Sequence, residues 1–392
     1  MPFALYLLGL AVFAQGTSEF MLSGLVQDIA ADLDVSLAAA GLLTSAFAVG
    51  MVIGAPLMAV LSLRWSQRRS LLTFLTVFLL VHVVGAVTAS YEVLLATRVV
   101  AAVANAGFLA VALVTAAGMV APTATGRATS VLLAGTTLAC VAGVPAGALL
   151  GQAWGWRSAF WAVALVSLPA VVGILRSVPP RVPGSAPPRA RAEVRALRRP
   201  RLQVVLLLGA LVNGATFCAL TYLAPLVTEV TGLGGGWVPV VLALFGVGSF
   251  VGVAVAGRLG DARPVQLLAV GGVALLAGWI AFALVAANPV ATLVVVLVQG
   301  ALGFAVGATL IAQALRAATG APTLAGAFAT AALNVGAALG PWLGGVAIAA
   351  GPGPRSSLWV SAALVALALA VGTTAHAVRR PAPTRAARPA AT

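Results

Sequence analysis

Long apolar stretches separated by short polar segments repeat along the whole chain. A helix needs about 20 apolar residues to cross a hydrocarbon layer roughly 30 Å thick. The pattern predicts twelve membrane-spanning helices, over residues 3–26, 37–61, 71–89, 92–119, 128–151, 158–177, 202–228, 237–257, 264–287, 290–315, 324–350 and 357–377. The first stretch lacks a basic segment ahead of it, so we interpret it as a retained span rather than a signal peptide.

Composition strengthens the membrane prediction. The 392 residues are 61% hydrophobic and only 8% charged, and their mean hydropathy is +1.10. A soluble globule of this length needs far more charge to cover its surface. The net charge of +14 comes entirely from Arg, but these Arg do not gather into the soluble patch that nucleic-acid binding requires. We therefore expect a lipid bilayer around the protein and no nucleic-acid partner.

The Arg positions also predict an orientation. Basic residues are retained on the cytoplasmic side during insertion. With a cytoplasmic N-terminus, almost all Arg fall in inner loops, and only Arg157 and Arg355 fall in outer ones. The prediction is a multi-pass protein of the cell membrane with both termini in the cytoplasm.

One internal segment, rich in Arg and Pro, divides the chain. It predicts a cytoplasmic linker over 178–201 between an N-terminal half, 1–177, and a C-terminal half, 202–378, followed by a basic cytoplasmic tail, 379–392. Each half contains six predicted spans. The fold class expected is an all-α membrane protein with twelve transmembrane helices in two pseudo-symmetric six-helix halves.

The two halves carry matching positions at a nearly constant separation. Glu19 in the first span corresponds to Asn213 in the seventh, and Pro145 in the fifth corresponds to Pro341 in the eleventh. This correspondence suggests duplication. Many secondary transporters use paired halves to build a midplane site with alternating access.

Two charged residues lie deep within predicted spans, Glu19 and Arg98. A charge inside a bilayer is costly, so such residues are functional candidates. Both lie at a similar depth from the outer end of their spans, which would allow them to meet. Burial disfavours a charged carboxylate, and a nearby Arg favours it. We interpret Glu19 as a proton carrier and Arg98 as its partner; a static ion pair that fixes helix register is the alternative.

Other reactive side chains receive plainer interpretations. His82 has no acidic or histidine neighbour at helical spacing and is interpreted as a structural residue. Cys140 and Cys218 fall within apolar stretches and are interpreted as packing residues rather than a disulfide. No metal site and no cofactor are expected.

Small residues recur at a spacing of four in four spans, which places each set on one helix face. Such stripes allow close helix approach, either for sliding or for static packing. Pro145 and Pro341 lie within two stripes and favour a kink. The stripes are Gly135, Ala139, Gly143, Gly147 and Gly151; Ala332, Gly336, Gly340 and Gly344; Ala46, Gly50 and Gly54; and Gly248, Gly252 and Ala256.

Five uncharged polar residues within spans are candidates for binding a substrate. A mostly apolar cavity with a few polar groups suits a neutral ligand of moderate polarity. Hydrogen bonds between helices are the competing explanation. These residues are Asn105, Asn213, Tyr222, Gln299 and Asn334.

Several segments resemble the twelve-span drug:proton antiporters of the major facilitator superfamily. Residues 143–147 (Gly-Val-Pro-Ala-Gly) resemble the family's antiporter motif in helix five, and residues 94–105 around Arg98 resemble its helix-four motif, which contains a proton-linked Arg. The resemblance covers essentially the whole chain and implies the major facilitator fold. It implies a conformational role for Gly143, Pro145 and Gly147 and for their counterparts Gly340, Pro341 and Gly344.

The loop after the second span also resembles a family motif, from Gly54 through Arg68 and Arg69. The family's Asp is replaced there by Leu63, whereas the second half keeps Asp261. The resemblance implies a cytoplasmic gate that involves Arg64, Arg68, Arg69, Arg258 and Asp261.

A closer resemblance concerns the drug. Residues 16–21 (Gly-Thr-Ser-Glu-Phe-Met), residues 23–25 and residues 213–217 are similar to chloramphenicol-resistance exporters of actinomycetes. This similarity implies a proton-coupled antiporter that exports a small neutral antibiotic, chloramphenicol in particular, with the drug and protons as its partners.

Other functions remain open at this point. A sugar or metabolite facilitator would use the same polar residues. An intramembrane enzyme is disfavoured because the chain has no HExxH or GxSG motif. An ATP-driven pump is excluded from this chain, because a Walker A motif needs a Lys and the sequence has none.

Overall fold

The computed structural model describes residues 2–62, 65–121, 124–178, 198–259, 263–318, 325–351 and 353–378. Twelve helices in these ranges are long and apolar enough to cross a membrane. The same ranges contain no strand. Both results confirm the prediction of an all-α protein with twelve spans.

The first six spans lie between Phe3 and Ser177. The first is α1 (Phe3–Phe20) with a 3₁₀ turn, η1 (Met21–Gly24), followed by the short α2 (Val26–Asp32). The next three are α3 (Leu37–Ser62), α4 (Gln67–Val87) and α5 (Tyr91–Gly118). The fifth consists of α6 (Thr125–Leu138), a π-helical turn η3 (Ala139–Gly143) and α7 (Val144–Trp154), and the sixth is α8 (Arg157–Ser177).

The last six spans begin after the linker. The seventh is α10 (Pro200–Thr221), extended by α11 (Leu223–Pro225) and a π-helical turn η5 (Leu226–Val230). A 3₁₀ turn, η6 (Gly235–Trp237), leads into α12 (Val238–Leu259). The remaining spans are α13 (Pro264–Val285), α14 (Pro289–Ala317), α15 (Ala325–Ala349) and α16 (Ser356–Val378).

Some helix ends differ from the predicted ends for local reasons. The third span begins at Gln67 rather than at residue 71, because the Ser66 hydroxyl caps the helix by accepting a hydrogen bond from the Arg69 backbone N–H. The first and seventh spans are both interrupted near their ends, at Phe20 and at Tyr222. With Glu19 matched to Asn213, the interruption of the seventh span lies eight residues further along the helix than that of the first.

Proline affects the fifth and eleventh spans differently. In the fifth, the π-helical turn ends directly before α7, which has Pro145 in its first turn, where the missing N–H is tolerated. In the eleventh, Pro341 lies inside a continuous α15. The regular α-helix is thus interrupted just before Pro145 in the fifth span, whereas α15 stays α-helical through Pro341.

Two large hydrophobic cores and one small cluster between α10, α14 and α15 hold the helices together. The first six spans pack around the fully buried Phe78, Phe108 and Phe160, and the last six pack around Trp279 and Phe282. The second core also includes five residues of the first half: Phe20, Ala48, Cys140, Val144 and Ala148. Each half is thus a packing unit of its own, and these five residues mark where the halves meet.

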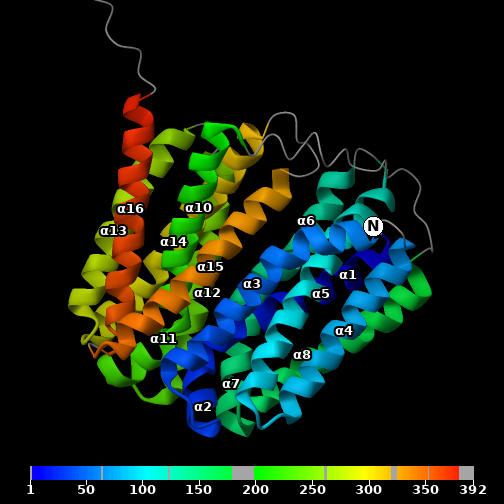
Figure 1. Cartoon of the computed structure of the whole chain (residues 1–392), viewed down its shortest axis with the longest axis horizontal. Helices are drawn as coiled ribbons and strands as arrows, with labels where there is room; N and C mark the ends of the chain where they lie inside the picture. Colours follow the sequence, from blue (N-terminus) through cyan, green and yellow to red (C-terminus); the bar gives the residue numbers. More distant parts are fainter. Residues whose placement is uncertain are drawn as a thin grey trace, which may run out of the picture.

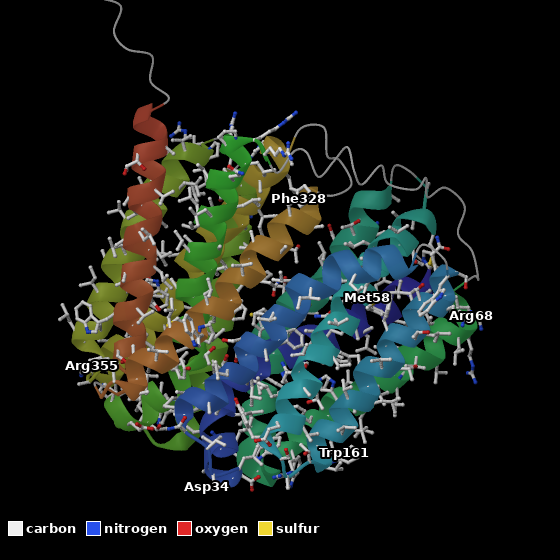
Figure 2. The ribbon with its side chains drawn as sticks, in the orientation of Figure 1. Asp34, Met58, Arg68, Trp161, Phe328 and Arg355 are labelled. Atoms are coloured by element: carbon white, nitrogen blue, oxygen red, sulfur yellow. The ribbon has the colours of Figure 1, made fainter. Side chains whose placement is uncertain are left out.

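The two ends of the bundle are distinct. We call the end where α1 begins and α16 ends the termini side, and the opposite end, where α2 lies, the far side (Figure 1). Figure 2 shows Arg68 toward the termini side and Asp34 and Arg355 toward the far side. This arrangement agrees with the loops to which the sequence pattern assigned these charges.

The halves touch mainly toward the far side. Phe20 of α1 and Phe217 of α10 have ring centroids 5.5 Å apart. In the middle of the bundle, the Ser45 hydroxyl of α3 donates to the Ala338 carbonyl of α15 at 2.7 Å. From there the ribbons of the two halves diverge toward the termini side (Figure 1).

Candidate functional site

The stripe of small residues in the fifth span lies against α1, the helix that carries Glu19. A Cβ atom added at Gly143 would collide with the Thr17 side chain, whereas one at Gly147 would lie 3.4 Å from the Met21 Cβ, an ordinary contact. The predicted close approach is therefore present, and it is tighter at Gly143 than at Gly147.

The eleventh span makes the equivalent contact with α10. A Cβ atom at Gly336 or Gly340 would collide with the backbone of Ala210 or Gly214, and one at Gly344 would lie 2.7 Å from the Cys218 Sγ. The contact of α15 with α10 thus repeats the contact of the fifth span, through α6 and η3, with α1. The remaining two stripes behave alike: Gly50 and Gly54 of α3 face α5, and Gly248 and Gly252 of α12 face α14.

All four stripes form seams inside a half. Different glycines make the contacts between the halves. Gly41 of α3 lies against the Tyr222 ring, and Gly246 of α12 lies against the Cys140 carbonyl and the Val141 backbone. These two glycines belong to none of the predicted stripes. A signal was present for Gly41, because Ser45 follows it at a spacing of four on a face of α3 that differs from the Gly50 and Gly54 face.

A buried polar network connects three helices of the first half. The Arg98 side chain of α5 is 1% exposed, and it donates from Nη1 to the Ser18 Oγ at 2.8 Å and from Nη2 to the Ser18 carbonyl at 2.6 Å. The Ser18 Oγ also lies 2.6 Å from the His82 Nε2 of α4. The guanidinium group stacks over the Phe47 ring of α3, with its carbon 4.5 Å from the ring centroid.

Glu19 is the residue next to this network. Its side chain is half-buried, and it makes no hydrogen bond or ion pair to Arg98, although both residues belong to the described part of the chain. The similar depth of Glu19 and Arg98 is as predicted, but the Arg98 guanidinium is bonded to Ser18 instead of to the carboxylate. This difference arises because neighbouring residues on a helix point about 100° apart.

His82 has a larger set of partners than the sequence suggested. Besides Ser18, its Nδ1 lies 2.6 Å from the Phe78 carbonyl oxygen, and its ring lies against the rings of Phe78 and Phe160. Helical spacing reveals only partners on the same helix, and the Ser18 hydroxyl comes from α1. Thus His82 is fully bonded, as a structural residue would be, but its partner also holds Arg98.

The five uncharged polar candidates divide into two groups. Three bond to backbone carbonyls of neighbouring spans: Asn213 Nδ2 to Leu333 at 2.8 Å, Tyr222 Oη to Pro341 at 2.8 Å and Gln299 Nε2 to Leu275 at 3.2 Å. The other two differ. Asn334 donates only within its own helix, to Thr330. The side chain of Asn105, a residue that is 5% exposed, makes no hydrogen bond to another described residue.

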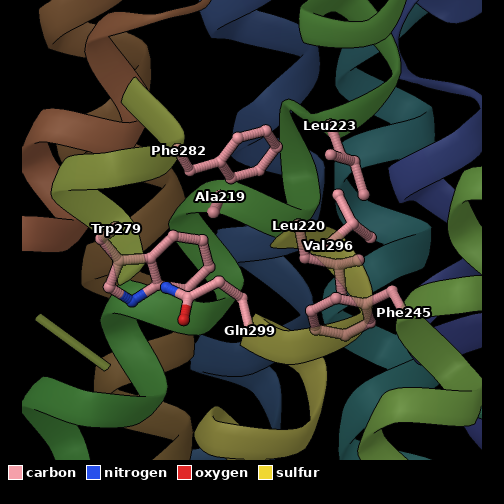
Figure 3. A pocket seen from close by; sticks show the side chains of 8 residues that line it. All are labelled: Ala219, Leu220, Leu223, Phe245, Trp279, Phe282, Val296 and Gln299. Atoms are coloured by element: carbon pink, nitrogen blue, oxygen red, sulfur yellow. The ribbon is translucent and has the colours of Figure 1, made fainter. Parts of the chain in front are cut away.

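A small cavity lies beside Gln299 in the second half. Its walls come from α10, α11, α12, α13 and α14, and Figure 3 shows the Gln299 amide beside the Trp279 indole. The Gln299 Oε1 and the Trp279 Nε1 are both buried without a hydrogen-bond partner in the structure. The cavity volume is about 10 Å³, enough for one water molecule and far too small for a drug.

The far side carries an ion pair that ties α2 to α8. Arg157 donates to an Asp32 carboxylate oxygen and to the Thr88 carbonyl, the latter at 2.9 Å, and the Trp156 Nε1 donates to Asp32 at 3.1 Å. The hydrogen bond from Arg157, aided by the one from Trp156, lowers the pKa of Asp32. Burial instead raises the pKa of Asp28.

The predicted gate loop is only partly described. Arg68 donates to the Leu175 carbonyl, and the Arg69 guanidinium lies over the Trp65 ring at 5.4 Å. Arg258 is exposed at the end of α12. Arg64, Leu63 and Asp261 lie outside the described residues, as do most of the predicted linker and the basic tail.

Comparison with known proteins gives a consistent result. A family model described as the Major Facilitator Superfamily matches residues 8–331. The chain is 58% identical to the "Chloramphenicol resistance protein" of Streptomyces lividans over 374 residues, which cover 95% of each protein. It is 34% identical to the "Inner membrane transport protein YdhP" of Escherichia coli (strain K12) over 351 residues, or 90% of each protein.

Solved structures share the fold. A bacterial homolog of the human lysosomal transporter Spinster, in an inward-facing and occupied conformation, superimposes with a TM-score of 0.78 at 18% sequence identity. The match covers 97% of this chain and 98% of the homolog. The inward-facing and unoccupied form of that homolog gives a TM-score of 0.76.

Proposed function

Because the chain belongs to the major facilitator superfamily, we propose that it exports chloramphenicol, or a closely related small neutral antibiotic, in exchange for protons. The observation that carries the drug assignment is the 58% identity to the Streptomyces lividans chloramphenicol resistance protein over 95% of both chains. So high an identity over full length supports a shared ligand as well as a shared fold. The expected result of this activity is resistance to the drug.

The proton-coupling part of the proposal rests on Glu19 and Arg98. Glu19 is a half-buried carboxyl in α1, and the buried Arg98 holds the neighbouring residue, Ser18. An ionisable group inside a span is expensive and usually serves transport. The equivalent position in the second half is the neutral Asn213, which bonds to a backbone carbonyl. Glu19 is therefore the group we assign to proton transfer.

We assign the termini side to the cytoplasm. Arg68, Arg69, Arg176, Arg258 and Arg316 all lie in loops or helix ends on that side, and basic residues are retained in the cytoplasm. The hydrogen bonds that the described residues make between the halves lie in the middle of the bundle or on the far side. In this assignment the conformation is closed toward the outside.

Among the polar candidates, Asn105 is the one we assign to the drug. It is the member of the set whose side chain makes no hydrogen bond to another described residue, and it lies on the same helix as Arg98. Chloramphenicol is neutral and carries hydroxyl and amide groups, which an amide side chain can bind. A sugar site would need several free polar groups, and three of the five candidates already bond between helices.

Drug accumulation tests the proposal directly. A chloramphenicol-sensitive host that expresses the protein should accumulate less labelled chloramphenicol than a host with the empty vector, and an ionophore that collapses the proton gradient should abolish the difference. The Glu19→Gln variant at equal expression is the matched control. Equal accumulation with and without the protein would refute the drug assignment, and export that persists after collapse of the gradient would refute proton coupling.

A further inference from the structure

We infer that Ser18 and His82 are positioning residues that hold the Arg98 guanidinium away from the Glu19 carboxyl and so set the pH at which Glu19 exchanges its proton. The inference rests on the proposed role of Glu19 in proton coupling. It gives a function to His82, which neither its own helix nor the drug assignment explains.

The hydrogen bonds fix the direction of each donor. The Phe78 carbonyl oxygen can only accept, so the His82 Nδ1 carries the hydrogen and the His82 Nε2 has a free lone pair. The Ser18 hydroxyl therefore donates to Nε2. Its oxygen is then free to accept from the Arg98 Nη1 at 2.8 Å. A neutral His82 thus orients the Ser18 hydroxyl so that it can hold Arg98.

Arg98 depends on this arrangement because it has few other partners. Its Nη2 bonds to the Ser18 carbonyl, and its Nε has no partner in the structure. The Phe47 ring lies against one face of the guanidinium. Burying a cation that has lost a hydrogen-bond acceptor is costly. The next acceptor along α1 is the carboxylate of Glu19, which follows Ser18 and has no hydrogen bond to Arg98. Without the Ser18 hydroxyl, Arg98 would turn toward Glu19.

No other ionisable group of the described residues lies within the network. Around it, α3 contributes Phe47 and α8 contributes Phe160. The Cys140 thiol lies on η3, which packs against α1. The other ionisable side chains on α1, α4, α5, α6 and α8 lie toward the helix ends: Tyr6, Arg68, Arg69, Tyr91, Glu92, Arg127, Arg157 and Arg176. The distance between Arg98 and Glu19 is therefore the variable that Ser18 and His82 control.

The direction of the effect follows from charge. Pairing with Arg98 stabilises the ionised carboxylate, so Glu19 would then take up a proton only at lower pH. Ser18→Ala and His82→Leu both disrupt the hydrogen bonding that fixes Arg98. Both should shift the midpoint of Glu19 protonation, and of efflux, toward acid. In His82→Gln, the new amide oxygen can accept a hydrogen bond from the Ser18 hydroxyl. The midpoint of His82→Gln should therefore differ less from the native midpoint than the midpoint of His82→Leu does.

Ser167→Ala is a matched control. Ser167 is a fully buried serine in α8 of the same half, and its hydroxyl bonds only to the Val163 carbonyl of its own helix. Ser167→Ala removes a buried hydroxyl but leaves the network of Ser18, His82 and Arg98 intact. Any effect of this variant therefore measures the general cost of losing a buried hydroxyl in the first half.

The experiment has two readouts on purified protein in proteoliposomes. The first is pH-driven chloramphenicol efflux as a function of pH. The second is an infrared titration of the protonated carboxyl band that disappears in Glu19→Gln, which reports the protonation of Glu19 without any transport. For Ser18→Ala and His82→Leu, we expect both midpoints to move toward acid by about one pH unit, and no movement for Ser167→Ala.

The two readouts separate failure of the inference from failure of the proposed function. If the native protein shows no pH-driven efflux but the infrared midpoint shifts as expected, the antiport proposal is wrong and the positioning role stands. If the infrared midpoints of Ser18→Ala and His82→Leu equal that of the native protein, the positioning role is wrong, whatever happens to the transport rate.

Discussion

The Gln27 side chain donates a hydrogen bond from Nε2 to the Glu229 carboxylate at 2.9 Å, and this bond joins the two halves on the far side. Gln27 also bonds to the Thr228 hydroxyl at 3.1 Å. A second link between the halves, from the Gln152 Nε2 to the Gly235 carbonyl, lies close by. These bonds must break before the far side can open.

Loss of the Gln27 bonds should therefore favour opening. We expect Gln27→Ala to shift the equilibrium by about 1 kcal/mol, or roughly fivefold, toward the open far side. The native Cys140 reports this change because it is buried where the halves meet, against Gly246. In a Cys218→Ala background, a membrane-impermeant maleimide added from the far side should label Cys140 faster in the variant.

Gln266→Ala is the control for this measurement, since Gln266 is exposed on α13 at the termini side. Cys140 in the Gln266→Ala variant should be labelled at the native rate. Equal labelling of Gln27→Ala and Gln266→Ala would mean that these hydrogen bonds do not hold the far side closed.

The antiporter-like segment should tolerate alanine at one glycine but not at the next. Gly143→Ala would push the Thr17 side chain, whereas Gly147→Ala would make only an ordinary contact with Met21. We expect the first variant to lose most of its transport and the second to keep it, at equal membrane expression. Overpacking of this kind typically lowers the free energy of unfolding by about 1–3 kcal/mol.

A second substitution checks the cause of that loss. Thr17→Ala removes the colliding Oγ1 and Cγ2 atoms, so it should restore part of the transport in the Gly143→Ala background. If Gly143→Ala transports normally, or if Thr17→Ala brings no recovery, contact with α1 does not explain the need for glycine.

Acid should remove the contribution of Asp32 to stability. The hydrogen bond from Arg157 lowers the pKa of Asp32 in the folded protein, so this stabilisation is present above the ordinary pKa of Asp and is lost as the pH falls through the lowered value. Because the ion pair is partly exposed, we expect it to contribute less than about 1 kcal/mol to the free energy of unfolding. Asp32→Asn should therefore lower the thermal unfolding temperature slightly at neutral pH and not in strong acid.

Asp34→Asn gives the comparison, because Asp34 makes no ion pair among the described residues. It should not reproduce this pH-dependent difference. If Asp32→Asn lowers the unfolding temperature by the same amount at neutral and at strongly acidic pH, the ion pair is not the cause of the lower stability.

Asn105 and Gln299 should respond differently to substitution. We expect Asn105→Ala to raise the KM for chloramphenicol roughly tenfold, the cost of about one hydrogen bond to the ligand. Gln299→Ala should lower the thermal stability, because Gln299 bonds to the Leu275 carbonyl, and should leave the KM unchanged. The reverse pattern would place the drug beside Gln299 and remove Asn105 from the site.

The sequence by itself determined the twelve spans, the repeat of two halves and the depth of Glu19 and Arg98. Hydropathy over about 20 residues defines a span, and counting along a helix at 1.5 Å per residue gives depth. The stripes of small residues also predicted which helix faces pack closely. None of these properties requires knowledge of a neighbouring helix.

Only the tertiary structure decided which side chains meet. The spans are apolar on nearly all sides, so their sequences do not specify which neighbouring helix each face meets, even where a stripe of small residues marks a closely packed face. The rotation of each helix about its axis brings Ser18, rather than Glu19, to Arg98 and His82. It also pairs Gly143 with Thr17 and Gly41 with Tyr222. Packing between side chains from distant segments sets these rotations, and no local pattern in the sequence records them.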